Sequence, residues 1–489
     1  MKQPIRCTLA VAALWLGLLV PAMAVEAADA DKTIDVGDRK QWFIDGLFFA
    51  SSSNITLQVK PPVKTGERTL VSDRPWENAT LNWFSVMEDG GKYRMWYECY
   101  DVEGWPTTDD TSFCYAESAD GIHWEKPALG LFSYHGASDN NILFRQIGGE
   151  GAHSRVHGAG VFKDPSGPPE ARYRAVSQGM FAGADPPYRV AGMHSADGLR
   201  WTRLPGPICD VFADSQYSAF WDTSTSQYAL YGRVSGRGRA IGRSTSAACE
   251  RFAPPELVLE TNNQDPVGAD FYNPAAIKYP HADNVYLMFP SLYNHATDTL
   301  DIHLAVSRDG IHWSRPGRGS PFIPLGPAGS FDSGSLYMGQ GMIRSGNELW
   351  LYYSGSPLKH NEAELDALAK PENQRVFSRV VSRLDGLVCA QANDKGGSFT
   401  TSPLAFAGSR LLLNVKAGAF GEVRVGLLDA DGKPIAGRAV DDCIAITGDL
   451  IDKAVAWKNG IDLGGLAKSP VRMVVKMRNA ELFAFRFSG

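Results

Sequence analysis

Ser118-Ala-Asp120-Gly121-Ile-His-Trp124 is the first of three nearly identical phrases in the sequence. The other two are Ser195-Ala-Asp197-Gly198-Leu-Arg-Trp201 and Ser307-Arg-Asp309-Gly310-Ile-His-Trp313, and weaker copies occur at 243–252 and 382–387. An Asp-Gly pair favours a tight hairpin turn because glycine readily takes positive φ, and the following tryptophan can pack across the turn. The phrase therefore predicts a repeated hairpin, in which Asp120, Asp197 and Asp309 cap turns.

Two further elements precede each copy of the phrase. One is a short β-rich run around a tyrosine or another large apolar residue, at 93–97, 173–176, 228–231, 285–289 and 349–353. The other has more small residues, as strands crowded around an axis require, at 82–87, 157–162, 215–221, 272–277 and 335–339. Four-stranded units repeated five times predict an all-β fold, a five-bladed β-propeller. The alternative is an array of β-sandwich hairpins that resemble one another by chance.

The same pattern suggests the domain organisation. We expect the propeller over 79–395, preceded by a lead-in at 25–78 whose strand candidate, Trp42-Phe-Ile-Asp45, completes the last blade and closes the ring. From about residue 396 the apolar residues alternate, and Phe483, Phe485 and Phe487 end the chain with a period of two. This pattern therefore predicts a separate C-terminal β-sandwich over residues 396–489.

The N-terminus has the features of a secretory signal peptide. Lys2 and Arg6 precede an apolar run at 9–20, and Ala22-Met23-Ala24 is a small-x-small cleavage pattern. We therefore expect residues 1–24 to be removed and the mature protein to be secreted or periplasmic, the alternative being an uncleaved membrane helix. Cys99 and Cys114 are the nearest pair for a disulfide in such a compartment, although connectivity cannot be read from sequence.

Composition excludes several kinds of partner. The formal net charge of −6 comes without a basic patch or a basic amphipathic helix, so we expect neither a nucleic-acid partner nor stable membrane insertion. No C-x-x-C or Cys/His cluster has zinc spacing, so we predict no metal and no cofactor. A calcium ion in the fold or at its axis, and the oligomeric state, stay open.

In a propeller, functional residues are expected on one face of the disc, where the inner strands begin and the middle strands end. Carboxylates at such positions are the catalytic candidates: Asp214, Asp270, Asp332, Glu77 and Glu98. The candidates for substrate binding at the same positions are Asp101, Arg155, His157, Arg233, Asn273, His295, Ser333 and His360.

Carboxylates that converge from several blades suit glycoside hydrolysis. One must protonate the leaving oxygen while another acts as base or nucleophile. Histidine and arginine beside them could bind hydroxyl groups, a uronate or a sulfate. We therefore predict an extracytoplasmic glycoside hydrolase acting on a poly- or oligosaccharide substrate. A structural reading competes for each acid, because aspartate at the start of a strand often only caps a turn.

Several phrases resemble the five-bladed propeller glycosidases of the arabinanase, invertase and levansucrase type. They are Phe43-Ile-Asp45, Pro75-Trp76-Glu77, Met95-Trp-Tyr-Glu98, Asp270-Phe-Tyr-Asn273-Pro and Phe331-Asp332-Ser-Gly. The chain is most similar to exported bacterial proteins described as resembling the N-terminal domain of glycoside hydrolase family 32. That resemblance implies a propeller with a terminal sandwich and three acids at the axis, one from each of the first three blades.

The sequence also departs from that family. The invertase phrase Asn-Asp-Pro-Asn-Gly is absent, Asp164-Pro165 falls at the far end of an inner strand, and Glu98-Cys99 lies on the first blade instead of the third. The resemblance to this family therefore supports the prediction of the fold more strongly than the prediction of the catalytic acids. Two other functions stay open: a non-catalytic glycan-binding propeller and, as a minor alternative, a sialidase-like enzyme.

Overall fold

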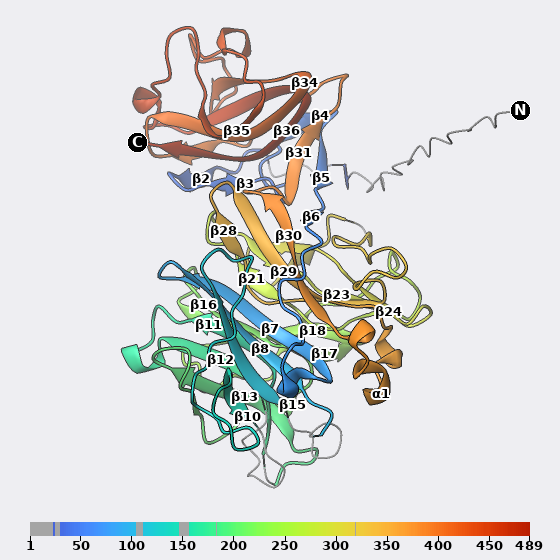
Figure 1. Cartoon of the computed structure of the whole chain (residues 1–489). Coiled ribbons are helices and arrows are strands. Elements are labelled where there is room, and N and C mark those ends of the chain that lie inside the picture. The colour runs from blue at the N-terminus through green and yellow to red at the C-terminus, as the bar shows by residue number, and fades with distance from the viewer. Residues whose placement is uncertain (1–22, 25–29, 104–110, 146–155, 182, 318) are drawn as a thin grey trace, which may run out of the picture.

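The computed structural model describes residues 23–24, 30–103, 111–145, 156–181, 183–317 and 319–489, and these residues form an almost entirely β structure (Figure 1). A propeller-like ring of sheets occupies one part of the molecule, and the C-terminal strands form a second body beside it (Figure 1). The structure thus confirms the predicted all-β class. The proposed signal peptide lies outside the described residues except for Met23–Ala24. No helix among the described residues is long and apolar enough to cross a membrane.

Four sheets of the ring have the form of blades, with strands following one another outward from the axis. The first contains β7 (Thr80–Asp89), β8 (Lys92–Tyr100), β9 (Ser112–Ser118) and β10 (Ile142–Arg145). The second contains β11 (His157–Lys163), β12 (Tyr173–Met180), β13 (Tyr188–Ser195), β14 (Thr202–Arg203) and β15 (Cys209–Phe212). The third contains β16 (Ser218–Asp222), β17 (Gln227–Gly236), β18 (Gly238–Ser246) and β19 (Glu256–Leu259). The fourth contains β21 (Ala276–Lys278), β22 (Tyr286–Met288), β25 (Ala305–Ser307) and β26 (Trp313–Ser314).

The last set of ring strands belongs to a larger sheet. β27 (Ser335–Met338), β28 (Ile343–Ser345), β29 (Glu348–Ser356) and β30 (Val376–Arg383) are followed outward by β6 (Val63–Lys64). One parallel pairing joins them to β20 (Asp270–Phe271), β23 (Ser291–Asn294) and β24 (Thr299–Ile302). A ring of five separate blades therefore stays a prediction.

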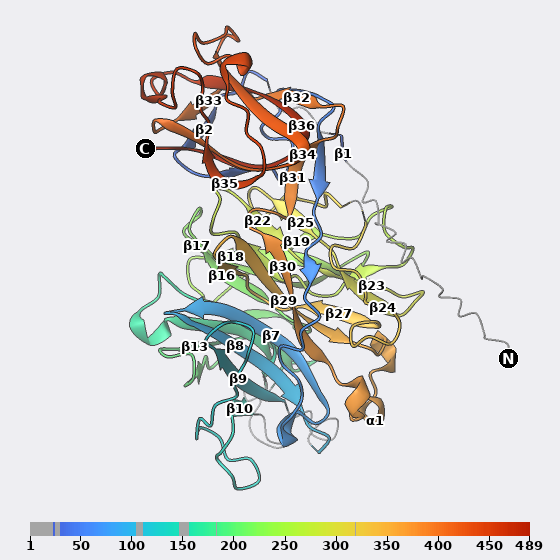
Figure 2. The same ribbon diagram turned by 45° about the horizontal axis from the view of Figure 1, so that its top comes forward.

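The strand from the lead-in that pairs with this last set is β6, which lies alongside β30 (Figure 2). The prediction that Trp42-Phe-Ile-Asp45 would complete the last blade was wrong. β3 (Gln41–Trp42) pairs instead with the C-terminal β36, because the Trp42 and Phe43 side chains are fully buried in the large core that includes Phe485.

The C-terminal body is an eleven-stranded sheet built on two long antiparallel strands, β34 (Arg410–Asp429) and β36 (Val471–Ser488). Its other members include four short N-terminal strands, β1 (Met23–Ala24), β2 (Ile34–Gly37), β4 (Ser51–Ser53) and β5 (Thr56–Val59). The rest are β3, β31 (Val388–Ala392), β32 (Gly397–Thr400), β33 (Leu404–Phe406) and β35 (Asp449–Ala454). A two-layered sandwich and the boundaries of the four predicted segments stay predictions.

Helical structure is confined to short segments. The helix α1 (Leu365–Leu368) lies between β29 and β30, flanked by the 3₁₀ turns η3 (His360–Glu362) and η4 (Pro371–Asn373). The other 3₁₀ turns are η1 (Pro75–Glu77), η2 (Pro169–Ala171), η5 (Val440–Asp442) and η6 (Gly464–Leu466). All six described cysteines are free thiols, and the buried Sγ atoms of Cys99 and Cys114 lie 3.6 Å apart.

Small residues let the inner strands crowd around the axis, as the sequence predicts. A Cβ atom on Gly158 would lie 2.1 Å from the carbonyl oxygen of Ser215, and Gly158 has a φ of +65°. A Cβ on Gly160 would lie 2.1 Å from the carbonyl oxygen of Tyr217. Any larger residue at either position would force the β11 and β16 strands apart. The starts of these strands consequently meet at one mouth of the axis.

The repeated turn phrase is held by its own serine and aspartate. The Asp120 Oδ1 atom accepts hydrogen bonds from the backbone N–H groups of Ile122 and His123, both at 2.8 Å, and Ser118 Oγ accepts one from Gly121 at 2.8 Å. The same bonds recur around Asp197 and Asp309. The prediction that these acids cap turns is confirmed.

Each turn is also bound to the preceding set of strands. The carbonyl oxygens of the phrase glycines accept hydrogen bonds from an aromatic residue on that set's middle strand: Tyr352 to Gly121 (2.7 Å), Trp96 to Gly198 (2.6 Å) and Tyr231 to Gly310 (2.7 Å). The phrase tryptophans are half-buried and donate to the same carbonyls. The turns therefore connect neighbouring sheets as well as neighbouring strands.

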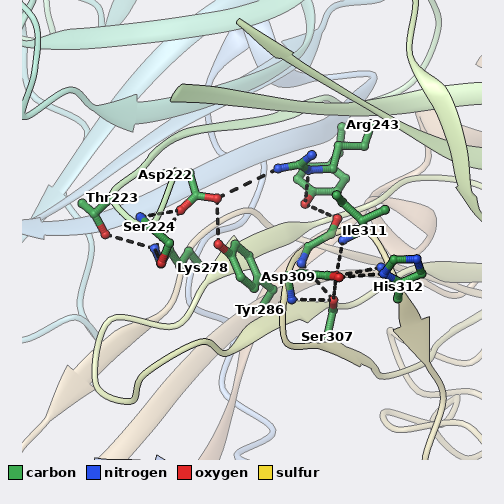
Figure 3. A network of polar contacts seen from close by, with 12 residues as sticks. Asp222, Thr223, Ser224, Arg243, Lys278, Tyr286, Ser307, Asp309, Ile311 and His312 are labelled. Carbon is green, nitrogen blue, oxygen red and sulfur yellow. Dashed lines mark hydrogen bonds and ion pairs between the residues drawn. The ribbon is translucent and has the colours of Figure 1, made fainter. Parts of the chain in front are cut away.

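A second repeated contact joins the sheets at the opposite mouth of the axis. An aspartate that ends an inner strand accepts a hydrogen bond from the tyrosine that begins the next middle strand: Tyr173 to Asp89, Tyr228 to Asp164 (2.7 Å) and Tyr286 to Asp222 (2.7 Å). Figure 3 shows the Asp222 carboxylate facing Tyr286, with Lys278 Nζ at 2.7 Å. Burial acts to raise the pKa of Asp222, but the bonds from Lys278 and Tyr286 outweigh it and lower that pKa.

Replacing Tyr286 with Phe should therefore weaken the ring. A hydrogen bond to a charged group contributes roughly 1.5–3 kcal/mol, and we expect the free energy of unfolding in urea to fall by that amount. Tyr93 begins β8, and its hydroxyl makes no hydrogen bond within the described part of the chain, so Tyr93→Phe is the matched control. Equal losses in the two variants would contradict the role of the Asp222 contact.

Candidate functional site

Side chains from several sheets meet at the mouth where the inner strands begin. Asn82 lies on β7, His157 begins β11, Asp214 precedes β16, Tyr272 precedes β21 and Tyr337 lies on β27. Direct contacts connect these residues across the axis. Side chains from several sheets therefore converge at this mouth, which we call the axial site.

A line of three side chains crosses the axial site. Glu98, at the end of β8, is 1% exposed, and its Oε1 atom lies 2.8 Å from His157 Nδ1. The His157 Nε2 atom lies 3.8 Å from Asp214 Oδ1. A single imidazole thus lies between two carboxylates that come from the first and third sheets. Such a line can move a proton between Glu98 and a group beside Asp214.

The Glu98 carboxylate is fixed by hydrogen bonds on both oxygens. Oε1 accepts one from the Tyr100 hydroxyl at 2.8 Å, and Oε2 accepts one from the Gly158 N–H and one from Asn82 Nδ2, both at 3.2 Å. The donors come from β7, β8 and the start of β11. These bonds hold the carboxylate in one orientation and, with it, the His157 ring.

Asp214 has the properties of a permanently ionised carboxylate. Burial acts to raise its pKa, but the neighbouring His157 ring and the positive charge of Arg233 outweigh burial and hold the pKa well below its usual range. Arg233 Nη1 donates directly to Asp214 Oδ2. The Asp214 side chain is nevertheless 36% exposed, so a substrate can reach it.

Asp270 forms a second acidic centre in the axial site. Its Oδ2 atom accepts hydrogen bonds from Arg239 Nη1 at 3.1 Å and from the Arg239 backbone N–H at 3.2 Å, and it lies 3.1 Å from His295 Nε2. A cavity of about 580 Å³ opens beside it, lined in part by Arg233, Arg239 and the exposed ring of Phe212. This volume is in the range of a small-molecule or oligosaccharide subsite.

Aromatic rings form one wall of the axial site around Tyr272. The ring centroid of Tyr272 lies 6.1 Å from that of Trp83 in a stacked arrangement, 5.6 Å from Tyr337 and 5.0 Å from His360. The guanidinium carbons of Arg233 and Arg239 lie 4.5 Å and 5.1 Å from the Tyr272 centroid. We call Trp83, Tyr272, Tyr293, Tyr337 and His360 the Tyr272 cluster.

His360 is neutral at physiological pH in this surrounding. Burial, followed by the positive charges of Arg375 and Arg239, lowers its pKa from 6.5 to about 4. Its Nδ1 atom lies 2.9 Å from the Tyr337 hydroxyl. A neutral imidazole can donate a hydrogen bond through one nitrogen and accept through the other.

The lowered pKa of His360 predicts a pH dependence of stability. Below pH 6.5 the unfolded chain binds a proton on His360, whereas the folded protein does not until about pH 4, so this contribution to stability is lost as pH falls across that window. We expect His360→Asn to reduce the fall in melting temperature between pH 6.5 and 4. Replacement of His123, an exposed turn residue whose pKa Asp120 raises, should not reduce it. Identical profiles for the wild type and His360→Asn would contradict the assignment.

Two predicted catalytic acids lie in buried ion pairs. Glu77 is fully buried and accepts hydrogen bonds from Lys126 Nζ and the Tyr97 hydroxyl, both at 2.6 Å. Asp332 accepts one from Lys64 Nζ on β6 at 2.6 Å; burial acts to raise its pKa, and Lys64 helps to lower it. A structural role explains both acids, and neither contacts the line from Glu98 to Asp214.

Some of the predicted substrate-binding residues lie in the axial site, and others make structural contacts elsewhere. His157, Arg233, His295 and His360 lie in the axial site, whereas Asp101 is 1% exposed and forms an ion pair with Arg145 at 2.6 Å. Ser333 Oγ donates to the Ser330 carbonyl at 3.0 Å. Arg155 lies outside the described residues.

Asn273 is the remaining candidate, and its surroundings are unusual. It follows Tyr272 directly and is fully buried, yet neither its Oδ1 nor its Nδ2 atom has a hydrogen-bond partner within the described residues. Buried amide groups are normally hydrogen-bonded. Its part in substrate binding stays a prediction.

Sequence reasoning missed three aromatic residues of the Tyr272 cluster and two arginines. Trp83, Tyr272 and Tyr337 lie within the predicted inner-strand runs, which were recognised by their small residues and not by their aromatic rings. Arg239 is the second residue of β18 and Arg375 immediately precedes β30, and both strands are the third of their sets. Because a hairpin returns the third strand to the mouth where the middle strand ended, the turn Gly236-Arg-Gly238 could have pointed to Arg239.

No family model matches the chain. Two curated Mycobacterium tuberculosis proteins, from strains CDC 1551 / Oshkosh and ATCC 25618 / H37Rv and both described as uncharacterized, are each 31% identical over 153 residues, 30% of this chain. The chain spans 41% of the length of these relatives. The resemblance to glycoside hydrolase family 32 therefore stays a prediction.

Solved structures of similar shape are distant in sequence. One described as a glycoside hydrolase is 15% identical, with a TM-score of 0.48 over 66% of this chain and 92% of its own. One described as a glycosyl hydrolase from Bacteroides ovatus is 14% identical, with a TM-score of 0.45 over 67% and 94%. A third comes from work on the GH130 family of mannoside phosphorylases, described as containing glycoside hydrolases that target β-1,2 mannosidic linkages in Candida mannan. It is 13% identical, with a TM-score of 0.48 over 66% and 94%.

Proposed function

We propose that this chain is a glycoside hydrolase that cleaves a poly- or oligosaccharide in the axial site. The observation that carries the proposal is the line Glu98, His157 and Asp214, in which two carboxylates flank one imidazole. Arg233, which is paired with Asp214, also lines the open cavity beside Asp270. Glycoside hydrolysis needs one group that donates a proton to the leaving oxygen and a second that stays ionised. In this line His157 can donate the proton, and Asp214 stays ionised.

His157 is positioned to donate the proton. Its Nδ1 side is held by Glu98, and its Nε2 side faces Asp214 at 3.8 Å, a separation longer than a hydrogen bond. Flanking carboxylates stabilise positive charge on the ring. When a glycosidic oxygen lies next to Nε2, the imidazolium transfers its Nε2 proton to that oxygen as the bond to the anomeric carbon breaks. The Glu98 carboxylate keeps the ring oriented through Nδ1.

Asp214 supplies the negative charge. Its low pKa keeps it ionised, so it stabilises the cationic character of the anomeric carbon in the transition state. It then acts either as the base that activates water or as the nucleophile. The configuration of the first sugar product, followed by NMR of its anomeric proton, distinguishes inversion from retention and therefore these two roles.

Screening the mature protein against plant and algal glycans tests the proposal. Release of reducing sugar from at least one glycan, and its loss in the Asp214→Asn variant, would support hydrolysis. Release by the variant at the wild-type rate would assign the activity to another site or to a contaminant. Release from none of the glycans would favour the second candidate function.

The second candidate is a glycan-binding propeller without turnover. Two observations favour it: Asp214 and Asp270 are each paired with an arginine, and the Tyr272 cluster offers aromatic faces on which sugars stack. Such a protein would bind a glycan by calorimetry and leave it intact over days. It would also tolerate Asp214→Asn with little change in affinity.

We further propose that the protein works outside the cytoplasm and that its ring has five blades. Residues 1–24 support the first point and the repeated sequence units the second. N-terminal sequencing of the exported protein should begin near Val25. Recovery of Met1 on the exported form would contradict cleavage.

A further inference from the structure

We propose that the axial site takes a sugar that carries an anionic group, a carboxylate or a sulfate, and that Arg375 binds this group. The inference rests on the proposed function and adds the chemical class of the substrate. It depends on the surroundings of Arg375, a residue that the sequence patterns did not indicate. Those surroundings differ from the surroundings of the two neighbouring arginines.

Arg375 immediately precedes β30 and lies against the Tyr272 cluster. Its guanidinium carbon is 5.0 Å from the ring centroid of Tyr337, and its Nη1 atom donates to the side-chain oxygen of Asn82. The Nε atom is buried and has no hydrogen-bond partner in the described part of the chain. Asn82 is neutral, so Arg375 retains an uncompensated positive charge.

The other two arginines of the axial site already have acidic partners. Arg233 is paired with Asp214, and Arg239 is paired with Asp270 at 3.1 Å. Arg375 has no carboxylate within ion-pair distance among the described residues. A partly buried guanidinium without a counter-charge is unfavourable unless a ligand supplies one. Its planar fork of donors matches a carboxylate or a sulfate.

The electrostatic surroundings favour the same class of ligand. Arg233 and Arg239 lie over the Tyr272 ring, and Arg375 lies over Tyr337, which contacts Tyr272 edge-on at 5.6 Å. The positive charges of these arginines help to lower the pKa of His360, which lies between the same rings. Because His360 is neutral, it can donate to an anion without adding a further charge. Aromatic faces beside the guanidinium provide a stacking surface for the sugar ring.

The position of Arg375 also fixes where the anionic group lies relative to the scissile bond. The Asn82 side chain accepts from Arg375 and donates to Glu98 Oε2 at 3.2 Å. An anion on Arg375 is therefore separated from the proposed proton relay by one amide group. We infer that the charged substituent belongs to a sugar directly at the cleaved linkage and not to a distant unit of the chain.

Calorimetric titration of the full-length mature protein tests the inference without requiring turnover. The probes are glucuronate, galacturonate, glucose 6-sulfate, and the neutral sugars glucose and galactose. We expect the charged sugars to bind more tightly than the neutral ones. Arg375→Gln should lower affinity for the charged sugars roughly ten- to a hundred-fold and leave the neutral sugars unchanged. Comparison of the uronates with the sulfated sugar identifies which anion the site prefers.

Two further variants make the result specific. Arg375→Lys keeps the charge but loses the planar fork, so it should restore only part of the affinity. Arg478→Gln removes an arginine that is 54% exposed on β36 and should change nothing. Circular dichroism and the melting temperature show whether each variant is folded. If folded Arg375→Gln discriminates charged from neutral sugars as well as the wild type does, the inference is wrong.

The outcomes separate this inference from the proposed function. Arg375-dependent binding of anionic sugars without hydrolysis of any glycan would support the anion site and overturn the hydrolase. Hydrolysis of neutral glycans at a rate that Arg375→Gln does not change would support the hydrolase and overturn the anion site. Hydrolysis of uronate-containing or sulfated glycans that depends on both Arg375 and Asp214 would support both.

Discussion

Asp214→Asn should lower the rate of glycoside cleavage by about 10²- to 10⁴-fold, the usual loss when a general acid or base is removed. Asparagine keeps the size of the side chain but cannot stay ionised, so it provides neither the charge for the anomeric carbon nor a proton acceptor. The measurement is kcat on the glycan that the screen identifies. Glu98→Gln should have an effect in the same range, because it no longer stabilises charge on His157.

Asp210→Asn is the matched control for Asp214→Asn. Asp210 lies four positions earlier, its side chain is 82% exposed, and it too is paired with an arginine, Arg189, at 2.7 Å. This variant should retain wild-type kcat. Full activity in folded Asp214→Asn would move the chemistry to Asp270, whose carboxylate borders the cavity.

Lys126→Met should lower the free energy of unfolding by about 3–5 kcal/mol, the usual effect of removing one partner from a buried ion pair. The Lys126 side chain is 5% exposed, the Glu77 side chain is 0% exposed, and their charged atoms lie 2.6 Å apart. Methionine leaves Glu77 buried without its counter-charge. Unfolding in urea or guanidinium measures the loss, and the double variant Glu77→Gln with Lys126→Met should recover part of it.

A surface pair provides the comparison for Lys126→Met. Lys92 and Glu117 lie 3.0 Å apart, but the Lys92 side chain is 57% exposed, so Lys92→Met should cost no more than about 1 kcal/mol. Glu77→Gln on its own also tests the earlier prediction that Glu77 is catalytic. A stable Glu77→Gln variant with no activity would restore that catalytic role.

The repeat made the sheet order predictable because turn residues carry local information. The turn acids accept hydrogen bonds from backbone groups two and three residues away: Asp120, Asp197 and Asp309. Each turn can therefore be recognised within a window of seven residues. The strand β6 is only two residues long, and its partner is β30. No periodicity can develop over two residues, so the sequence pattern indicates Trp42-Phe-Ile-Asp45 and not β6.

The candidate site was harder to predict, for a different physical reason. Glu77, Asp332 and Asp214 are the same kind of residue at similar positions before inner strands, and their roles differ because of their partners. Lys126 lies in a loop after the first Asp-Gly turn, and Lys64 lies in the lead-in. An ion pair with a residue far away in the sequence produces no recognisable pattern in the residues around the acid. The turn acids and the position of His157 were therefore predictable, whereas the separation of structural from reactive carboxylates was not.

The pairing of β6 with β30 determines when the ring of this protein can close during synthesis. Glu67, just after β6, is ion-paired with Arg379 of β30, and 312 positions separate the two residues. A ribosome delivers the first of these residues long before the second, and loop closure over so many residues is slow. Until residue 379 has been translated, β6 has no partner and the ring stays open. The last strand set of the ring therefore meets β6 late in synthesis, and the C-terminal body is completed only afterwards, because β3 pairs with β36.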